Sequence, residues 1–136
     1  MEELFLPYNE AIALRELGFY ENCLGCYIVD KTTDGDKPHF RLIYKANHPQ
    51  VLTPIYSQAF KFFREKYNAH HSISRLPQGA LDADAKRNNV LKKYAWYISK
   101  DSLNPSIPNN GNGKEDTYEK AELECLKELI KIVKEN

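Results

Sequence analysis

Apolar residues recur at helical spacing in three stretches of the chain, and each stretch opens with a tyrosine three residues ahead of an alanine. The three motifs are Tyr8 to Ala11, Tyr56 to Ala59 and Tyr118 to Ala121. Side chains three or four residues apart share one face of a helix, so the pattern predicts helices over about 7–17, 54–67 and 117–134. We interpret the repeat as structural, because a small alanine lets a helix lie close to a sheet while the tyrosine hydroxyl reaches water.

Residues at the ends of these stretches favour helix capping. Gly18 and Asn68 follow the first two, and both residue types adopt the left-handed conformation that closes a helix at low cost. Thr53, followed by a proline, predicts a capping residue and a first-turn proline for the second helix. Asp116, with Glu119 three residues later, resembles a capping box at the start of the third helix.

Alternating apolar and polar positions predict strands in the first gap between helices. Residues 23–30 and 40–45 read as the two strands of a hairpin around turn residues at 32–36, where an Asp-Gly pair favours positive φ. Alternation places one set of side chains of the return strand on the core side. That set is Phe40, Leu42 and Tyr44.

The second gap is less regular. Residues 71–75 are a weak strand candidate, whereas 94–99 is a strong one because aromatic and β-branched residues dominate it. Segment 77–93 between them has poor periodicity, with a helical turn expected around 83–88. Prolines, glycines and asparagines in 101–115 predict a solvated loop.

Taken in order, the elements read α-ββ-α-ββ-α, which indicates an α+β fold in a single domain over residues 1–136. The simplest packing is one mostly antiparallel four-stranded sheet with helices over one face. The two α-ββ units, 7–45 and 54–100, resemble an internal duplication that the helix at 117–134 closes. This repeat is an argument about structure and assigns no activity.

Composition favours a soluble globular protein. A chain of 136 residues is long enough to bury roughly two thirds of its unfolded surface, and 42% hydrophobic content is too rich for disorder. The start of the chain is acidic where a signal peptide is basic, and no stretch has the length of a membrane span. Three cysteines without an export signal indicate reduced thiols. We therefore expect a cytoplasmic protein with no membrane partner.

Charge is balanced overall, with 19 basic and 19 acidic residues, but it is unevenly distributed. Residues 1–60 carry 5 basic and 8 acidic side chains, 61–100 carry 9 and 3, and 101–136 carry 5 and 8. The middle is therefore basic and both flanks are acidic. Such segregation can prepare a surface for an anionic partner, although the simpler explanation is that the acidic flanks fold back over the basic segment and neutralise it.

The basic middle leads directly into aromatic residues, a combination that single-strand nucleic-acid binders use to neutralise phosphates and stack bases. By alternation Tyr94 and Trp96 share one face of the strand and Tyr97 lies on the other. The simpler alternative is that Trp96 is part of the core and the lysines are solvated. The candidate nucleic-acid-binding residues are Lys86, Arg87, Lys92, Lys93, Tyr97 and Lys100.

Candidate catalytic and metal-binding patterns are weak. Cys23 and Cys26 form a CxxC, but a second closely spaced pair is missing, and the pair lies in or just before a strand instead of at a helix start. We expect structural thiols. His70 and His71 lack an accompanying nucleophile or metalloprotease motif. The aspartates around Gly35 lack the closing glutamate of a calcium loop. No catalytic residue, metal or cofactor is assigned.

The helical segments resemble a known group of proteins. Residues 53–67, TPIYSQAFKFFREKY, and 117–126, TYEKAELECL, together with the end of the first helix, ELGF, are similar to small uncharacterised proteins encoded in prophages and mobile elements of gut bacteria. The resemblance covers about half of the chain. It implies a bacterial cytoplasm, a phage or mobile-element origin and action through binding, and it carries over no functional residue.

Two classes of function follow. The leading hypothesis is a non-enzymatic binding or accessory module that contacts a protein or a nucleic acid through the sheet face or through segment 86–100. The alternative is a small enzyme whose site joins His70, His71, tyrosines and a carboxylate from an acidic flank. A histidine and a carboxylate at hydrogen-bond distance in one pocket would favour this alternative, and their separation on opposite faces would exclude it. The sequence leaves the ligand and the oligomeric state open.

Overall fold

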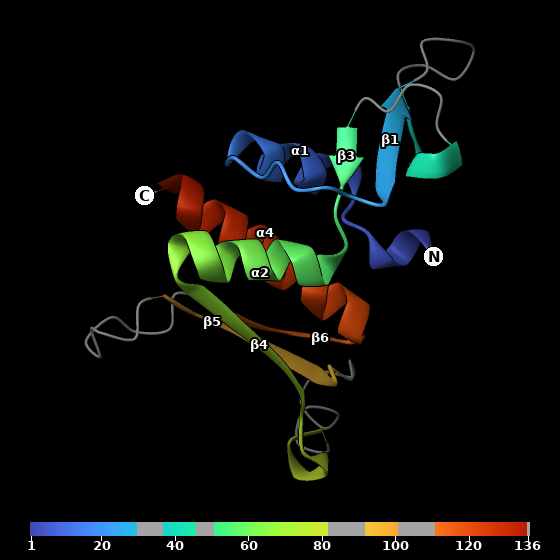
Figure 1. The fold of residues 1–136 in the computed structure, drawn as a ribbon. Coiled ribbons are helices and arrows are strands. Elements are labelled where there is room, and N and C mark those ends of the chain that lie inside the picture. The colour runs from blue at the N-terminus through green and yellow to red at the C-terminus, as the bar shows by residue number, and fades with distance from the viewer. Residues whose placement is uncertain (30–36, 46–50, 82–91, 101–110, 136) are drawn as a thin grey trace. The chain divides into compact units, whose positions relative to one another are not determined.

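The computed structural model describes residues 1–29, 37–45, 51–81, 92–100 and 111–135. The chain divides into two compact units, Met1–Ala59 and Phe60–Asn136, and the boundary lies inside the helix α2 (Tyr56–Tyr67). Each unit contains a three-stranded antiparallel sheet (Figure 1).

The α+β class predicted from the sequence is confirmed, but the single four-stranded sheet is wrong. The strand order is β2-β1-β3 in the first sheet and β4-β5-β6 in the second. Two strands that the pattern did not predict complete these sheets, namely β3 (Val51–Thr53) and β6 (Gly111–Glu115). The central strand comes first along the chain in one sheet and second in the other. The duplication of 7–45 and 54–100 stays a prediction.

The first unit comprises η1 (Glu2–Leu4), α1 (Tyr8–Glu16), β1 (Gly25–Val29), β2 (Pro38–Leu42), η2 (Ile43–Lys45), β3 and the first turn of α2. The predicted antiparallel pairing of β1 with β2 is confirmed, with Tyr27 opposite Phe40; the turn at 32–36 lies outside the described residues. The strand β2 ends at Leu42, whereas the alternating pattern predicted a strand that continues past Tyr44 with that side chain on the core side. Tyr44 is consequently exposed, because it lies in η2 instead of facing the core.

The core of the first unit is organised around the carbonyl oxygen of Leu6. The hydroxyls of Tyr27 and Thr53 both donate to it, at 3.0 and 2.8 Å. The Leu6 N–H donates to the carbonyl of Pro54. Thr53 is therefore a strand residue, and its predicted role as the cap of α2 is wrong. The side chain of Gln58 instead accepts a hydrogen bond from the N–H of Ile55 at 3.2 Å, just before the helix begins.

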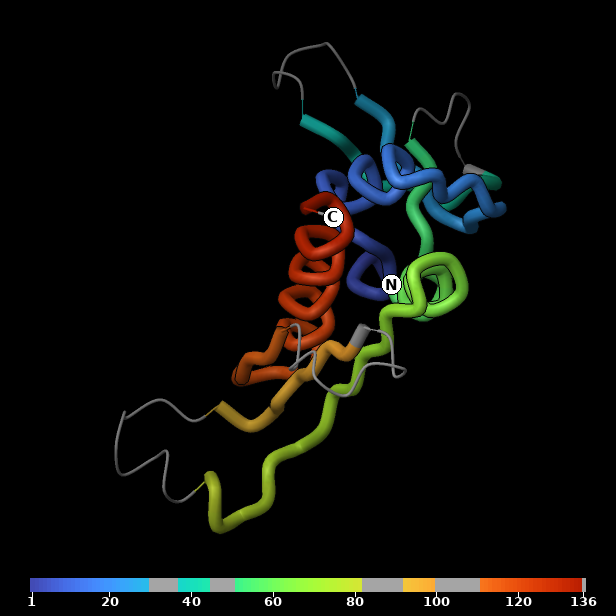
Figure 2. Tube along the Cα trace, turned by 90° about the vertical axis from the view of Figure 1, so that its left-hand side faces the viewer, coloured from blue at the N-terminus to red at the C-terminus, as the bar shows by residue number. Residues whose placement is uncertain are grey.

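The second unit comprises the rest of α2, β4 (Ala69–Arg75), β5 (Tyr94–Lys100), β6 and α4 (Tyr118–Glu135). Both α2 and α4 lie on the same side of this sheet (Figures 1 and 2). α4 buries a continuous stripe toward the strands, as amphipathic spacing requires. The stripe consists of Ala121, Cys125, Leu126, Leu129, Ile130 and Val133.

The three Tyr-x-x-Ala motifs each mark a helix start. α1, α2 and α4 begin at Tyr8, Tyr56 and Tyr118. The alanine of each motif is fully buried, with 1% or less of its surface exposed, so the predicted need for a small residue is met three times. Those alanines are Ala11, Ala59 and Ala121. The tyrosines differ, because Tyr56 is buried whereas Tyr118 is 44% exposed.

The caps predicted at the carboxyl ends of two helices are confirmed, whereas the cap predicted at the start of α4 is wrong. Gly18 and Asn68 adopt φ values of 97° and 52°, which confirms both predicted left-handed caps. At the start of α4, the hydroxyl of Thr117 accepts the N–H of Lys120 at 3.2 Å. The capping box predicted for Asp116 is therefore wrong by one residue, because Asp116 pairs with the ammonium group of Lys120 at 3.2 Å.

Candidate functional site

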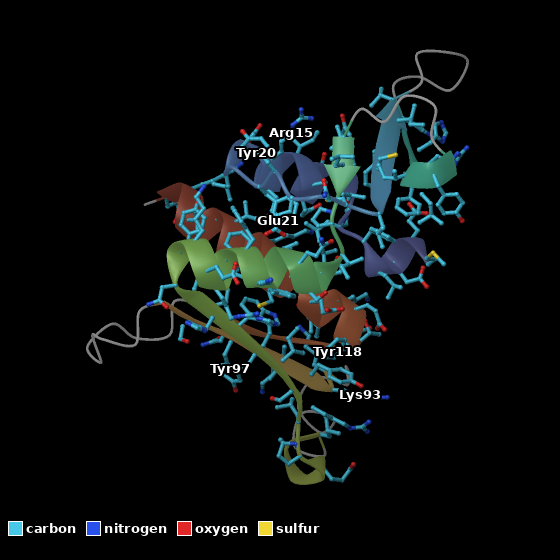
Figure 3. All side chains as sticks on the ribbon, in the orientation of Figure 1. Arg15, Tyr20, Glu21, Lys93, Tyr97 and Tyr118 are labelled. Carbon is cyan, nitrogen blue, oxygen red and sulfur yellow. The ribbon has the colours of Figure 1, made fainter. Side chains whose placement is uncertain are left out.

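One side of the sheet β4-β5-β6 is covered by α2 and α4. No helix of the described residues covers the other side, which we call the open face. Strand alternation and the pairing register assign to it His70, Ser72, Ser74, Ala95, Tyr97, Ser99, Asn112 and Lys114. All of these residues except Ala95 are exposed. Figure 3 shows Tyr97 projecting from β5 on the side away from the two helices.

Strand β5 separates an apolar side from a polar side. Trp96 and Ile98 are 7% and 0% exposed beneath the helices, whereas Tyr97 between them is 41% exposed. The predicted alternation of these aromatic residues is confirmed. Because the helices bury the alternate positions, the remaining positions of β5 must face outward.

A row of three polar side chains crosses the centre of the open face. Ser72 on β4 and Asn112 on β6 are both directly opposite Tyr97. Directly opposed residues place their Cβ atoms about 5 Å apart, so the phenol ring has a hydroxyl on one side and an amide on the other. This arrangement combines a flat apolar ring with hydrogen-bond donors and acceptors on both sides.

Cationic side chains lie on one side of this row, toward the beginning of β5. Lys92 is exposed and Lys93 is half-buried, just before β5 begins. The Leu76 N–H donates to the carbonyl of Lys93 at 2.8 Å, which extends the strand pairing by one step and holds this end in place. Lys114 lies opposite Ala95 on β6. Among the described residues of the open face there is no carboxylate.

The structure unites only part of the predicted nucleic-acid-binding set. Lys92 and Lys93 lie just before β5, and Tyr97 lies within it. Lys86 and Arg87 lie outside the described residues. The backbone of Lys100 ends β5 opposite Ala69, and its side chain is not among those described.

Sequence reasoning missed four residues of the open face that other strands contribute. Ser72 and Ser74 belong to a strand that was predicted weakly, and Asn112 and Lys114 belong to one that was predicted as a loop. The only signal in the sequence was the alternation within 71–75. The pairing register that sets these residues beside Tyr97 is a property of the folded sheet.

His70 and His71 point to opposite sides of β4. His70 is exposed, and its Nε2 lies 3.0 Å from the Asn68 side-chain oxygen. His71 faces the helices, where its ring stacks on Phe60 with centroids 3.6 Å apart. Burial lowers the pKa of His71 to about 4, and the nearby positive charges of Arg64 and His70 act in the same direction. The two histidines therefore do not form one site.

The three thiols are protonated at neutral pH. Cys26 and Cys125 are fully buried. Burial raises the pKa of Cys125 to about 12 and that of Cys23 to about 11, with neighbouring glutamates adding to each effect. The Cys23 thiol also donates to the carbonyl of Glu21 at 3.4 Å. Since a thiolate is the reactive species, these environments favour packing over nucleophilic chemistry.

Across the described ranges, no three His, Cys, Asp or Glu side chains are grouped so that they could hold a metal ion. None of the helices in the described part of the chain combines the length and apolar character needed to cross a membrane. Comparison with protein-family models, curated proteins and solved structures found no match to this chain.

Proposed function

We propose that this protein is a non-enzymatic binding module and that the open face is its binding surface. The observation that supports this most directly is the row Ser72–Tyr97–Asn112, which keeps an aromatic ring exposed at the centre of a polar sheet. A sheet normally hides its large aromatic residues beneath helices, as this one hides Trp96. An exposed ring among hydrogen-bonding groups is typical of a surface that contacts a ligand.

The separation of the two histidines favours binding over catalysis. A site assembled from His70 and His71 requires both rings to reach one substrate, but they lie on opposite sides of β4. The His71 ring is stacked on Phe60, and His70 contacts an amide instead of a carboxylate. General acid–base chemistry needs its groups within hydrogen-bond reach of the same atom.

The cellular setting is part of the same proposal. The likeness of the helical segments to proteins of prophages and mobile elements supports a phage-related origin and a bacterial cytoplasmic location. The high pKa values of the thiols are compatible with a reducing compartment, in which unpaired cysteines persist. A binding module of this kind would act on a component of the host or of the element itself.

Amide chemical shifts of isotope-labelled protein test the proposed surface. The protein is titrated separately with single-stranded oligonucleotides, duplex DNA, an acidic peptide and a neutral oligosaccharide. Saturable shifts centred on Ser72, Tyr97 and Asn112, which the substitution Tyr97→Ser abolishes, would support the open face. Each ligand is then recovered and its mass compared before and after, since chemical conversion would identify an enzyme.

The variant Tyr118→Ser is a matched control, because Tyr118 is exposed to a similar extent at the start of α4. It should leave the ligand-induced shifts intact. Saturable shifts confined to α4, or shifts that Tyr97→Ser leaves unchanged, would contradict the assignment of the surface. The emission of Trp96 checks that each variant is folded.

A further inference from the structure

We infer that the open face binds single-stranded nucleic acid, with one base stacked on the ring of Tyr97. This inference rests on the proposed function, because it names the partner of the same surface. Three features of the described residues carry it, namely the geometry of the central row, the sign of the surrounding charges and the placement of the nearby acidic side chains.

The central row fits an unpaired base. A base stacked on the Tyr97 ring has its edges beside Ser72 on one strand and Asn112 on the other, which are directly opposite Tyr97 in the register. A hydroxyl and a carboxamide supply both donors and acceptors, so they can meet the hydrogen-bonding edge of any base. In a duplex the base faces are already stacked, and the ring would have nothing to contact.

The surrounding charges are complementary to a phosphate backbone. Lys92 and Lys93 lie at one end of β5, and Lys114 lies one strand away on the open face. By strand alternation, Lys93 is on the same side of β5 as Tyr97, four residues or about 13 Å along the strand. The described residues of this face contain no Asp or Glu, so every full charge on it is positive and a polyanion meets no repulsion.

Acidic side chains near the sheet are directed to other contacts. Asp116, after the end of β6, pairs with Lys120 on α4. Glu115 lies opposite Tyr94, and alternation assigns it to the side covered by the helices. Neither of these two acidic side chains lies on the open face, whereas the competing explanation for the uneven charge requires acidic residues to fold back over the basic segment.

Fluorescence anisotropy tests the inference with labelled DNA and RNA single strands of about 12 nucleotides, a length within the range that one binding domain occupies. A duplex of the same sequence and an acidic peptide of similar charge are measured in parallel. Titrations are repeated between about 50 and 200 mM salt, where phosphate contacts weaken steeply. We expect the single strands to bind more tightly than the duplex and the peptide.

Two pairs of variants separate stacking from charge. Tyr97→Ser should weaken single-strand binding by between about 5-fold and 150-fold, the range found when one aromatic stacking partner is removed, whereas Tyr97→Phe keeps the ring and should bind like the wild type. Lys92→Glu with Lys93→Glu should weaken binding and reduce its salt dependence. The matched double reversal Lys127→Glu with Lys131→Glu, on exposed positions of α4, should leave both unchanged.

Trp96 supplies an internal control because it occupies the opposite side of β5 and is the protein's single tryptophan. Its emission should stay constant as a single strand saturates the open face. A large change in that emission would place the ligand on the helix side or indicate unfolding, and it would overturn the inference.

The outcomes distinguish this inference from the proposed function. The inference is overturned if no single strand binds at the lowest salt. It is also overturned if Tyr97→Ser binds single strands as tightly as the wild type does. If the acidic peptide then binds with the same dependence on Tyr97, the open face remains a binding surface with another partner. If single strands bind but only the α4 reversals weaken them, both the inference and the assignment of the surface are wrong.

Discussion

Trp96 and Gly113 are directly opposite each other on β5 and β6, and the indole occupies the space where any other residue would carry its side chain. A Cβ atom placed on Gly113 would be 2.6 Å from Nε1, Cε2 and Cζ2 of that ring. A Cβ atom placed on the second glycine, Gly111, would be 3.5 Å from Cζ3 of the same ring. The glycines of β6 are therefore the complement of a large aromatic residue on the neighbouring strand.

Replacing Gly113 with alanine should lower the free energy of unfolding by about 2–3 kcal/mol, because the added methyl group meets a buried ring that cannot move aside cheaply. Denaturant unfolding followed by the emission of Trp96 measures this loss and also reports any displacement of the ring. Gly79→Ala is the matched control, since nothing lies within 4 Å of its added Cβ. Because Gly79 lies in the helical turn at 78–81, Gly79→Ala should leave the free energy of unfolding unchanged or raise it by about 0.5–1 kcal/mol. Equal unfolding free energies for the two variants would contradict this account.

The contact between Trp96 and Gly113 explains why β6 could not be predicted from the sequence. Gly-Asn-Gly-Lys-Glu contains no aromatic or β-branched residue, and local propensity assigns it to a loop. Its strand conformation depends on Trp96, which provides the apolar surface that glycine lacks. Only a tertiary contact carries that information, so a reading of local pattern classified all of 101–115 alike.

The helices were predictable because their signals are local. The buried stripe of α4 and the tyrosine and alanine of each first turn lie within one element, and their spacing alone locates the helix start. Caps were less predictable because several residue types compete for the same backbone groups. Thr53 has a strong local preference for a cap, but its hydroxyl gains a buried acceptor in Leu6, and the tertiary contact prevails.

The candidate surface was predictable to a similar degree. Alternation along β5 correctly separated Trp96 from Tyr97, since it needs only the two-residue period of a strand. The identity of the neighbours Ser72 and Asn112 depends on the register of three strands. That register is set by packing against the helices, which the sequence pattern of one strand does not contain.

The shared acceptor at Leu6 predicts a coupled response to mutation. Thr53→Val and Tyr27→Phe each remove one of the two hydroxyls that donate to this carbonyl, and each should cost about 1 kcal/mol of unfolding free energy. The double variant should cost more than the sum, because no other described residue donates to this buried oxygen. Urea denaturation of the four proteins measures the coupling. Tyr20→Phe, at a position 80% exposed, should be neutral. Strict additivity would show that the two hydrogen bonds contribute independently, and it would contradict the predicted coupling.

The start of α4 gives a second stability test. Thr117→Ala should lower the unfolding free energy by about 1 kcal/mol, because its hydroxyl accepts the N–H of Lys120 in the first turn. Asp116→Ala should cost less than Thr117→Ala, since its ion pair with Lys120 is solvent-exposed. Thermal unfolding of the two variants under identical conditions ranks them. The reverse ranking would show that Asp116 caps the helix.

The stacked pair of His71 and Phe60 predicts how stability depends on pH. The His71 pKa is lowered from 6.5 to about 4 in the folded state, mainly by burial. Above pH 6.5 the ring is neutral in both states and has no effect. As the pH falls from 6.5 toward 4, the unfolded chain binds a proton that the folded protein excludes, so stability is lost progressively over this interval and the loss levels off below it.

We therefore expect wild-type protein to lose on the order of 2 kcal/mol of unfolding free energy between about pH 7 and pH 4 through this residue. His71→Phe retains an aromatic ring against Phe60 and cannot titrate, so the difference between the two stability curves should grow as the pH falls. Carboxylates contribute equally to both curves and cancel. His39→Gln serves as the control, because His39 is exposed on β2 and its variant should follow the wild-type curve. Urea unfolding at several pH values measures the difference, and parallel curves for wild type and His71→Phe would mean that the ring admits a proton without leaving its stack.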